Sequence, residues 1–213
     1  MKRVLLGICA LTVLAIPGQA QAQEGTYVRA FFGATFGNQG GGAVGGGVGI
    51  KATSKVQITG EFGLLSNVIP KSVADAVDQE AAVQADKIAV GGKASSDSSA
   101  KAQYGLVGFR STIRHISNGT FFIEVGAGVA HVTSKITAEW RNLTAQGRLE
   151  GLVTTSFTNG TPETKPMAAL GGGLALPLGK SSAIEMAYRF ATIMTTGTKI
   201  NTSKVYGAIR VGF

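Results

Sequence analysis

Eight segments of the sequence, each about ten residues long, alternate apolar residues with polar or small ones. Because successive side chains of a β-strand point to opposite faces, a period of two predicts strands with one apolar face. The pattern is clearest over residues 56–64, where valine, isoleucine, phenylalanine and leucine alternate with glutamine, threonine and glutamate. The predicted strands cover residues 26–36, 43–51, 56–64, 104–114, 121–129, 167–176, 184–190 and 204–213.

The two faces of these predicted strands differ in charge. The apolar faces carry no charged residue, whereas the opposite faces carry glycines with single arginines and glutamates. In a soluble β-sandwich or a lipocalin-like barrel, which also show alternation, the polar face meets water and the apolar face forms the core. Isolated charges among glycines are more typical of a packed polar interior with lipid outside. We therefore predict an all-β fold, an eight-stranded antiparallel up-and-down transmembrane β-barrel.

The connections between the predicted strands alternate in length. Residues 52–55, 116–120 and 177–182 form short connections, and residues 66–103 and 134–166 form long ones. Two smaller connections, 37–42 and 195–202, fall on the same side as the long pair. An even strand number with short periplasmic turns and longer extracellular loops is typical of bacterial outer-membrane barrels.

The N-terminal segment has the pattern of a secretion signal. Met1-Lys2-Arg3 is positively charged, residues 4–17 are almost all apolar, and small residues precede a predicted cleavage after Ala22 or Ala20. We therefore assign residues 1–22 to a cleaved signal peptide and residues 23–213 to the barrel domain. The single cysteine, Cys9, lies within the signal, so the mature chain is expected to have no disulfide and no thiolate metal site.

The composition of the chain bears on which ligands and cofactors it could bind. The chain has 31 glycines without a collagen period and a formal charge of +8, to which the predicted signal contributes two through Lys2 and Arg3. In an exported protein, the expected binding partner of this positive charge is an anionic lipid headgroup. The alternative is that the charge has no specific partner. The sequence has no metal-ligand cluster, phosphate-binding loop or nucleic-acid motif, so we expect no cofactor, no metal and no nucleic acid.

The last nine residues, Val-Tyr-Gly-Ala-Ile-Arg-Val-Gly-Phe, alternate back from a terminal aromatic residue, Phe213. This ending resembles the closing strand of small outer-membrane β-barrel proteins of the OmpA transmembrane domain, OmpX and OmpW type. The resemblance implies location in the outer membrane, with lipid and lipopolysaccharide as neighbours and a monomeric state. It also implies that the barrel assembly machinery reads Phe213 as a signal. It covers the architecture of the whole mature chain and implies no particular activity.

Strand parity predicts which charges point into the barrel. An eight-stranded barrel is just wide enough for side chains to fill, so inward charges must be paired. A three-residue loop, residues 117–119, would place Glu124 opposite Thr112, with Arg110 and Arg114 as diagonal neighbours that hold its carboxylate. The network is interpreted as a structural plug, or alternatively as a gated polar passage. The predicted inward charges are Arg29, Glu61, Arg110, Arg114, Glu124, Glu185, Arg189, Lys204 and Arg210.

The two long connections, 66–103 and 134–166, are the candidate sites for an extracellular ligand, although solvated loops without a partner fit the sequence equally. A weak capping pattern at Ser72 and an alanine-rich stretch predict a short helix up to about Lys87. Residues 91–101 are rich in serine, glycine and lysine and are expected to be mobile. The second connection contains Trp140 and further alternation, which predicts extended strands or a small hairpin over the mouth.

One run of residues could form an active site. His115-Ile116-Ser117-Asn118 resembles the His-x-Ser-Asn run of outer-membrane lipid A deacylases, which are also small barrels. That resemblance implies His115 as base and Ser117 as nucleophile, with Glu124 as the nearby acid. Three observations oppose it. The run lies in a predicted periplasmic turn, His115 is predicted outward while Glu124 is inward, and Ser-Asn-Gly is an ordinary turn sequence.

The sequence therefore favours a non-enzymatic integral outer-membrane barrel with a structural, adhesive or surface ligand-binding role. A narrow OmpW-like or porin-like channel for small solutes is the first alternative. A lipid A deacylase-like hydrolase is the second.

Overall fold

The computed structural model describes residues 25–37, 40–69, 71–88, 93–116, 119–143, 149–155, 162–194 and 199–213. The predicted signal peptide lies outside these residues. The strands are β1 (Tyr27–Phe36), β2 (Gly41–Lys51), β3 (Val56–Ser66), β4 (Lys93–Ile116), β5 (Gly119–Leu143), β6 (Leu149–Thr155), β7 (Glu163–Pro177), β8 (Ser182–Met194) and β9 (Lys199–Gly212), and one helix, α1 (Lys71–Ile88), lies between β3 and β4.

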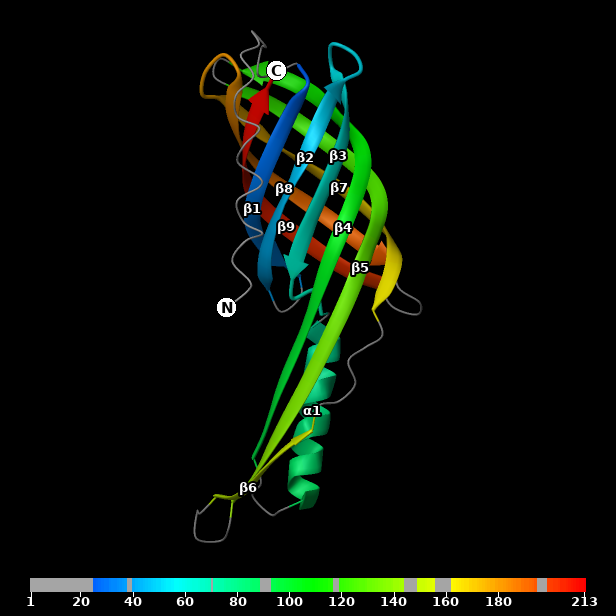
Figure 1. The fold of residues 1–213 in the computed structure, drawn as a ribbon, viewed down its shortest axis with the longest axis vertical. Coiled ribbons are helices and arrows are strands. Elements are labelled where there is room, and N and C mark those ends of the chain that lie inside the picture. Colours follow the sequence, from blue (N-terminus) through cyan, green and yellow to red (C-terminus); the bar gives the residue numbers. More distant parts are fainter. Residues whose placement is uncertain are drawn as a thin grey trace, which may run out of the picture.

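Eight of the strands close into an antiparallel barrel (Figure 1). Each pairs with its neighbours in the order β4-β3-β2-β1-β9-β8-β7-β5, and a further pairing of β4 with β5 closes the ring. The ninth strand, β6, pairs with the outer part of β5 and is not part of the ring. The prediction of an eight-stranded antiparallel up-and-down barrel is therefore confirmed.

The outer surface of the barrel is apolar. Phe32, Phe62 and Val107 are 72%, 68% and 67% exposed, and valine, isoleucine, leucine and methionine side chains occupy equivalent positions on the other strands. A continuous apolar surface of this kind is unfavourable in water. It suits a barrel whose outer face contacts lipid and whose inner face carries the polar groups.

Glycines on the inner face of β2 make room for large side chains on β1. Gly49 pairs with Tyr27, and a Cβ atom at Gly49 would lie 2.2 Å from the tyrosine ring. Gly45 pairs with Phe31 in the same way, and a Cβ atom there would lie 2.5 Å from the phenylalanine ring. The glycine-rich run at the start of the barrel therefore allows large inward residues of the adjacent strand to fill a narrow interior.

The half of the interior farther from the short turns is mainly apolar, with Thr35 and Thr202 as buried polar residues. Leu65, Met167 and Ile193 are buried there in one cluster with Ile200, Ala102 and Ala130, which we call the outer apolar layer. The segment that leaves β3 joins this cluster, because Val68 and Ile69 are buried and the Val68 N–H donates to the Ala100 carbonyl over 2.8 Å. The outer mouth is thus covered by packed apolar side chains.

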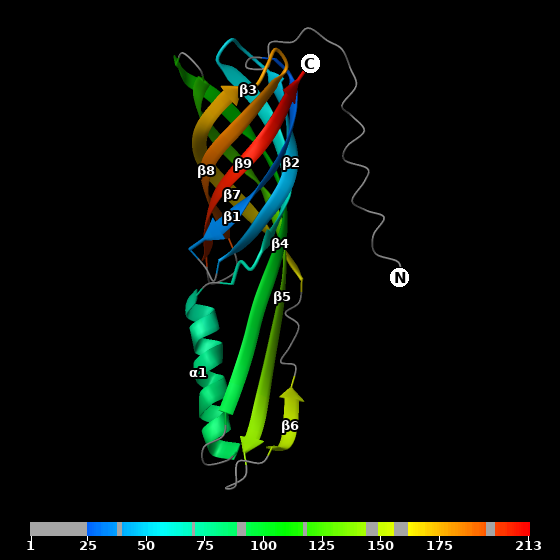
Figure 2. The same cartoon turned by 90° about the vertical axis from the view of Figure 1, so that its left-hand side faces the viewer.

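A projection extends from the same end of the barrel (Figures 1 and 2). The last pair between β3 and β4 is Ser66 with Lys101, and beyond it residues 93–100 of β4 pair only with β5. These eight residues span about 26 Å at the rise of a strand, and the 18 residues of α1 span about 27 Å at the rise of a helix. The helix therefore runs outward along the hairpin for the distance over which β4 returns.

The structure resolves the predictions for the long connections. The predicted helix is confirmed as α1. The expectation of a mobile segment at 91–101 is wrong for residues 93–101, because β4 begins at Lys93 and pairs with β5 along this length. Of the two alternatives for the second connection, the extended strand is confirmed, since β5 continues to Leu143. A hairpin over the mouth is not, because β6 pairs with residues 138–143 of β5 at the far end of the projection (Figure 2). Within the described part of the chain, no helix is both long and apolar enough to cross a membrane.

Candidate functional site

The barrel interior holds a cluster of charged side chains, the candidate site predicted from strand parity. Eight of the nine predicted inward charges are at most 6% exposed. They lie on six strands, β1, β3, β4, β5, β8 and β9. The antiparallel pairing of these strands brings the inward side chains close together in the barrel. The buried set comprises Arg29, Glu61, Arg110, Glu124, Glu185, Arg189, Lys204 and Arg210, which we call the interior charge network.

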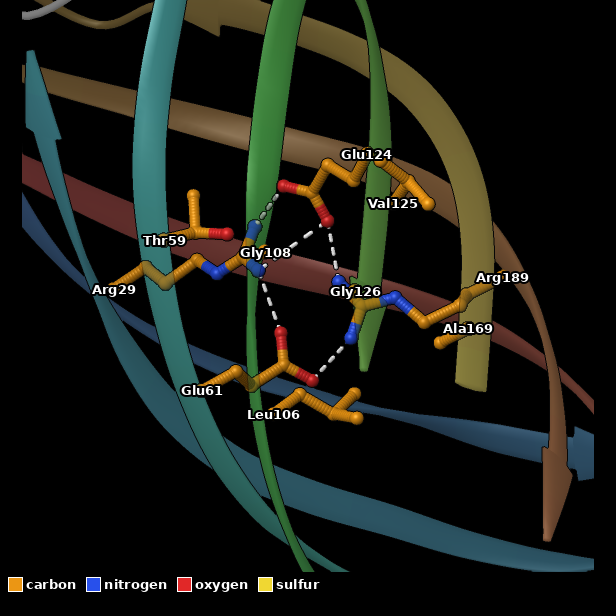
Figure 3. A pocket seen from close by; sticks show the side chains of 10 residues that line it. All are labelled: Arg29, Thr59, Glu61, Leu106, Gly108, Glu124, Val125, Gly126, Ala169 and Arg189. Atoms are coloured by element: carbon orange, nitrogen blue, oxygen red, sulfur yellow. Dashed lines mark hydrogen bonds and ion pairs between the residues drawn. The ribbon is translucent and has the colours of Figure 1, made fainter. Parts of the chain in front are cut away.

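Two glutamates in this network share the same two arginines (Figure 3). The Arg29 Nη1 atom lies 2.6 Å from Glu124 Oε1, and its Nη2 atom lies 2.5 Å from Glu61 Oε2. Arg189 likewise pairs with both carboxylates. The Tyr104 hydroxyl donates to Glu61 over 2.7 Å. Each carboxylate therefore has several donors, which is the condition under which buried charge is tolerated.

The third carboxylate, Glu185, lies nearer the end with the short turns. Its oxygens are 2.8 Å from Arg110 Nη1 and 3.3 Å from Arg210 Nη1, and Arg29 approaches it at 3.5 Å. Arg110 also reaches Glu124 at 3.4 Å, so it links this group to the first. The eight charges thus form one connected network across the barrel.

The network contains five cations and three carboxylates, so its formal charge is +2. Aromatic rings lie against two of these cations. The Arg110 guanidinium is 3.5 Å from the centre of the Phe122 ring, and the Lys204 ammonium is 4.1 Å from that of Phe31. A ring face attracts a cation most strongly where water is excluded. The aromatic residues of the interior were not among the predicted site residues. Phe31 pairs with Gly45 and Tyr104 pairs with Gly63, so a large residue opposite a glycine is a sequence pattern that could have indicated them.

The ninth predicted residue, Arg114, is a correction. Its side chain is exposed, because β4 has a bulge between Thr112 and Arg114. Thr112 pairs with Phe122, but Arg114 pairs with Phe121, whose side chain faces outward. The predicted three-residue loop is wrong as well. Ile116 pairs with Gly119, and the bulge at Ile113 restores the parity that a two-residue connection would otherwise break.

Glu124 points inward, as predicted, but its partners differ from those predicted. Glu124 pairs across the strands with Arg110 rather than with Thr112. Arg110 approaches it at 3.4 Å, whereas Arg29, which comes from a distant strand, approaches at 2.6 Å. Pairing between adjacent strands therefore predicts the longer of these two contacts and does not predict a contact across the barrel.

The possible catalytic run lies at the end of the barrel with the short turns. Its serine, Ser117, is outside the described residues. His115 shares a face with Thr120, and its Nδ1 atom lies 3.1 Å from the threonine hydroxyl. The prediction that His115 points outward is wrong, because the bulge also reverses its face. Glu124 is held by three arginines of the interior charge network, so it is committed to those cations rather than to His115.

The structure also describes the predicted assembly signal, Phe213, and the groups that could hold a metal ion. The Phe213 side chain is exposed at the short-turn end, and its N–H donates to the Thr26 carbonyl over 3.0 Å, next to the pairing of β9 with β1. In the described part of the chain, no group of three or more histidine, cysteine, aspartate or glutamate side chains lies close enough to hold a metal ion.

Two small cavities lie inside the barrel. A cavity of about 20 Å³ lies among Arg29, Glu61, Glu124 and Arg189, and one of about 10 Å³ lies between Arg189 and the outer apolar layer. Space of the first size holds about one water molecule. We therefore expect the purified barrel to give no discrete conductance steps in planar bilayers in molar potassium chloride. Reproducible steps from the folded chain, absent from a heat-unfolded sample, would contradict a filled interior.

Comparison with known proteins shows what the chain resembles. No protein-family model matches the sequence, and no curated protein matches it. Among solved structures, Neisserial surface protein A matches with a TM-score of 0.50 and 12% identity over 89% of this chain and 98% of that one. Ail of Yersinia pestis gives 0.43 and 13% over 88% and 99%. The N-terminal β-barrel domain of Pseudomonas aeruginosa OprF gives 0.43 and 12% over 88% and 98%. At these identities the likeness concerns the fold alone, and it is the first match that supports it.

Proposed function

We propose that this chain, which has the fold of the small outer-membrane β-barrel proteins, is a non-enzymatic integral outer-membrane protein that presents its projection at the cell surface. The projection is formed by α1, β6, residues 93–100 of β4 and residues 134–143 of β5. The barrel is the anchor, and the projection makes adhesive or ligand-binding contacts outside the cell. Lipid and lipopolysaccharide surround the barrel, which acts as a monomer.

The observation that carries this proposal is the contrast between the two parts of the molecule. The barrel interior is filled by the interior charge network and covered by the outer apolar layer. The β4–β5 hairpin, by comparison, continues far beyond the strands it needs to close the barrel. Strands of about 9–11 residues suffice to cross a membrane, whereas β4 and β5 have 24 and 25 residues. The additional residues of β4 and β5 form part of the projection.

The orientation follows from the asymmetry of the connections. In outer-membrane barrels the short turns lie in the periplasm and the long segments lie outside. The short turns of this chain are at the end where the C-terminus lies, and the projection is at the opposite end (Figure 1). This orientation places α1 and the outer hairpin in the extracellular space.

Removing the projection tests the proposal. In the test variant, residues 71–98 and 136–161 are each replaced with a short Gly-Ser linker. Cells that make this variant should be retained at least tenfold less than wild-type cells on at least one of three surfaces: bare glass, serum glycoprotein or bacterial polysaccharide. The physical reason is that the groups that make the contact are removed while the anchor remains.

The matched control replaces residues 195–198, between β8 and β9 at the same end of the barrel, with a Gly-Ser linker of equal length. This control should retain cells as the wild type does. Both variants are first checked for a folded barrel by heat-dependent migration in detergent gels. Equal retention of wild-type and projection-deleted cells on all three surfaces would overturn the proposed role.

A further inference from the structure

The end of the barrel with the short turns carries exposed cations on three of its connections. Lys55, Arg114 and Lys180 are exposed and lie at the β2–β3, β4–β5 and β7–β8 connections. Across the described residues of these connections and the adjoining strand ends, at 51–56, 112–116, 119–121 and 177–183, there is no aspartate or glutamate. The three buried carboxylates of the described residues, Glu61, Glu124 and Glu185, belong to the interior charge network. Within the described residues of these connections, the positive charge is therefore not balanced by an acidic side chain.

The bulge in β4 gives Arg114 its place in the rim. Without the bulge, parity would place Arg114 inside the barrel. With it, Arg114 stands on the lipid-facing side beside Phe121 and follows Ile113, which are 42% and 63% exposed. A bulge leaves one residue unpaired in the ladder and re-aims the side chains that follow it. The chain thus places a guanidinium at the edge of the apolar belt.

Backbone contacts hold the other two cations at the same edge. The Lys55 carbonyl accepts a hydrogen bond of 2.9 Å from the N–H of Thr112, two residues before Arg114. The Thr53 hydroxyl accepts from the Lys55 N–H over 3.3 Å, which fixes the turn. In the β7–β8 turn, the Leu178 N–H donates to the Ser182 carbonyl over 2.9 Å, around Lys180. The charged side chains therefore project from ordered turns.

The opposite edge of the apolar belt has a different chemistry. There, the exposed Lys101 and Lys199 are accompanied by uncharged outer-face side chains that bond to one another across strands, and Lys165 pairs with Glu163 at 3.0 Å. The Tyr188 hydroxyl lies 2.8 Å from that of Ser203, and the Thr192 hydroxyl donates to Asn201 over 3.0 Å. The two edges of the belt therefore offer different surroundings to the two leaflets of a membrane.

We propose that Lys55, Arg114 and Lys180 form a cationic rim that binds the phosphate groups of anionic phospholipids in the periplasmic leaflet. This inference rests on the proposed placement of the barrel in the outer membrane. Headgroup phosphates lie at the end of the lipid-facing apolar belt, where the three cations are found. A guanidinium can bind two phosphate oxygens at once, and lysine binds as a point charge. An acidic protein partner is the other ligand class with this chemistry, but the position beside exposed Ile113 and Phe121 favours a lipid.

Native mass spectrometry of the purified full chain tests the rim. The protein is mixed with equal amounts of phosphatidylglycerol and phosphatidylcholine that have the same acyl chains. We expect the wild type to bind phosphatidylglycerol at least threefold more. The double variant Lys55→Gln/Arg114→Gln should lose most of this preference, and adding Lys180→Gln should remove the rest. Arg114→Lys should keep it, because the charge remains.

The matched control is Lys101→Gln/Lys199→Gln, which removes two exposed lysines from the opposite end of the belt. This control should keep the preference of the wild type. An unchanged preference in the triple variant would overturn the rim, and so would a wild type without a preference, a result that does not depend on how the variants fold. Neither outcome affects the cell-retention test, so failure of the rim and failure of the proposed surface role are distinguishable.

Discussion

Replacing Glu124 with glutamine is expected to destabilise the barrel by about 3–5 kcal/mol, the cost of leaving buried charge without its partner. Glu124 is buried and contacts Arg29 at 2.6 Å, Arg110 at 3.4 Å and Arg189. Its loss would raise the formal charge of the interior charge network from +2 to +3. The measurement is the free energy of unfolding from reversible urea titrations in phospholipid vesicles.

The control for this prediction is Glu163→Gln. Glu163 pairs with Lys165 at 3.0 Å, but its side chain is 54% exposed, so its loss should cost less than about 1 kcal/mol. Removing Arg29 together with Glu124 should cost less than the sum of the two single changes, because the removed charges face each other. A destabilisation by Glu124→Gln as small as that of Glu163→Gln would show that the interior charge network does not hold the barrel together.

The second large effect is expected at Gly49. Replacing it with leucine should destabilise the barrel by about 1–3 kcal/mol or prevent its assembly, because overpacking forces side chains and backbone to shift. A Cβ atom at Gly49 would lie 2.2 Å from Tyr27 Cε1 and 2.7 Å from its hydroxyl oxygen. The ring is buried and cannot swing into solvent. The readout is the same urea titration, with heat-dependent gel migration to count the folded fraction.

Two further variants make this result specific. Gly105→Ala is the control, since a Cβ atom there would meet nothing within 4 Å and should be tolerated. Combining Gly49→Leu with Tyr27→Ala should recover part of the lost stability by vacating the occupied space. If Gly49→Leu alone is as stable as Gly105→Ala, the packing of large β1 residues against β2 glycines is not needed to fill the interior.

Sequence alone predicts the barrel well because parity is a local property. In a regular strand, one residue of known orientation fixes all the others, so the buried positions of Arg29, Glu61 and Glu185 follow from the apolar residues beside them. The same reasoning fails at Arg114 and His115. A bulge shifts parity by one residue, and a single sequence does not show where the ladder will admit an extra residue such as Ile113.

The contacts within the network also exceed what the sequence can predict. Strand pairing relates neighbours, whereas Arg29 on β1 meets Glu124 on β5 across the closed barrel. The outer part of β4 could not be predicted for another reason. Residues 93–101 are mainly small and polar, and composition of that kind predicts mobility, yet their pairing with β5 supplies backbone bonds that do not depend on the side chains.

The molecule joins a filled barrel to an outward projection, and each part corresponds to a different feature of the sequence. Glycines and single charges on the inner faces serve close packing around the interior charge network. The long connections serve α1 and the extended β4–β5 hairpin. In this account the barrel fixes where the projection stands relative to the membrane, and contact with the surroundings is left to the projection.

The most direct test of this account is the topology of the protein in intact cells. In a Cys9→Ser background, single cysteines are placed at Gln79, exposed on α1, and at Ala52, exposed in the β2–β3 turn. Cells are treated with a membrane-impermeant maleimide before and after permeabilisation of the outer membrane. We expect labelling of Gln79→Cys in intact cells, and of Ala52→Cys only after permeabilisation. Labelling of Ala52→Cys in intact cells, with Gln79→Cys protected, would contradict it.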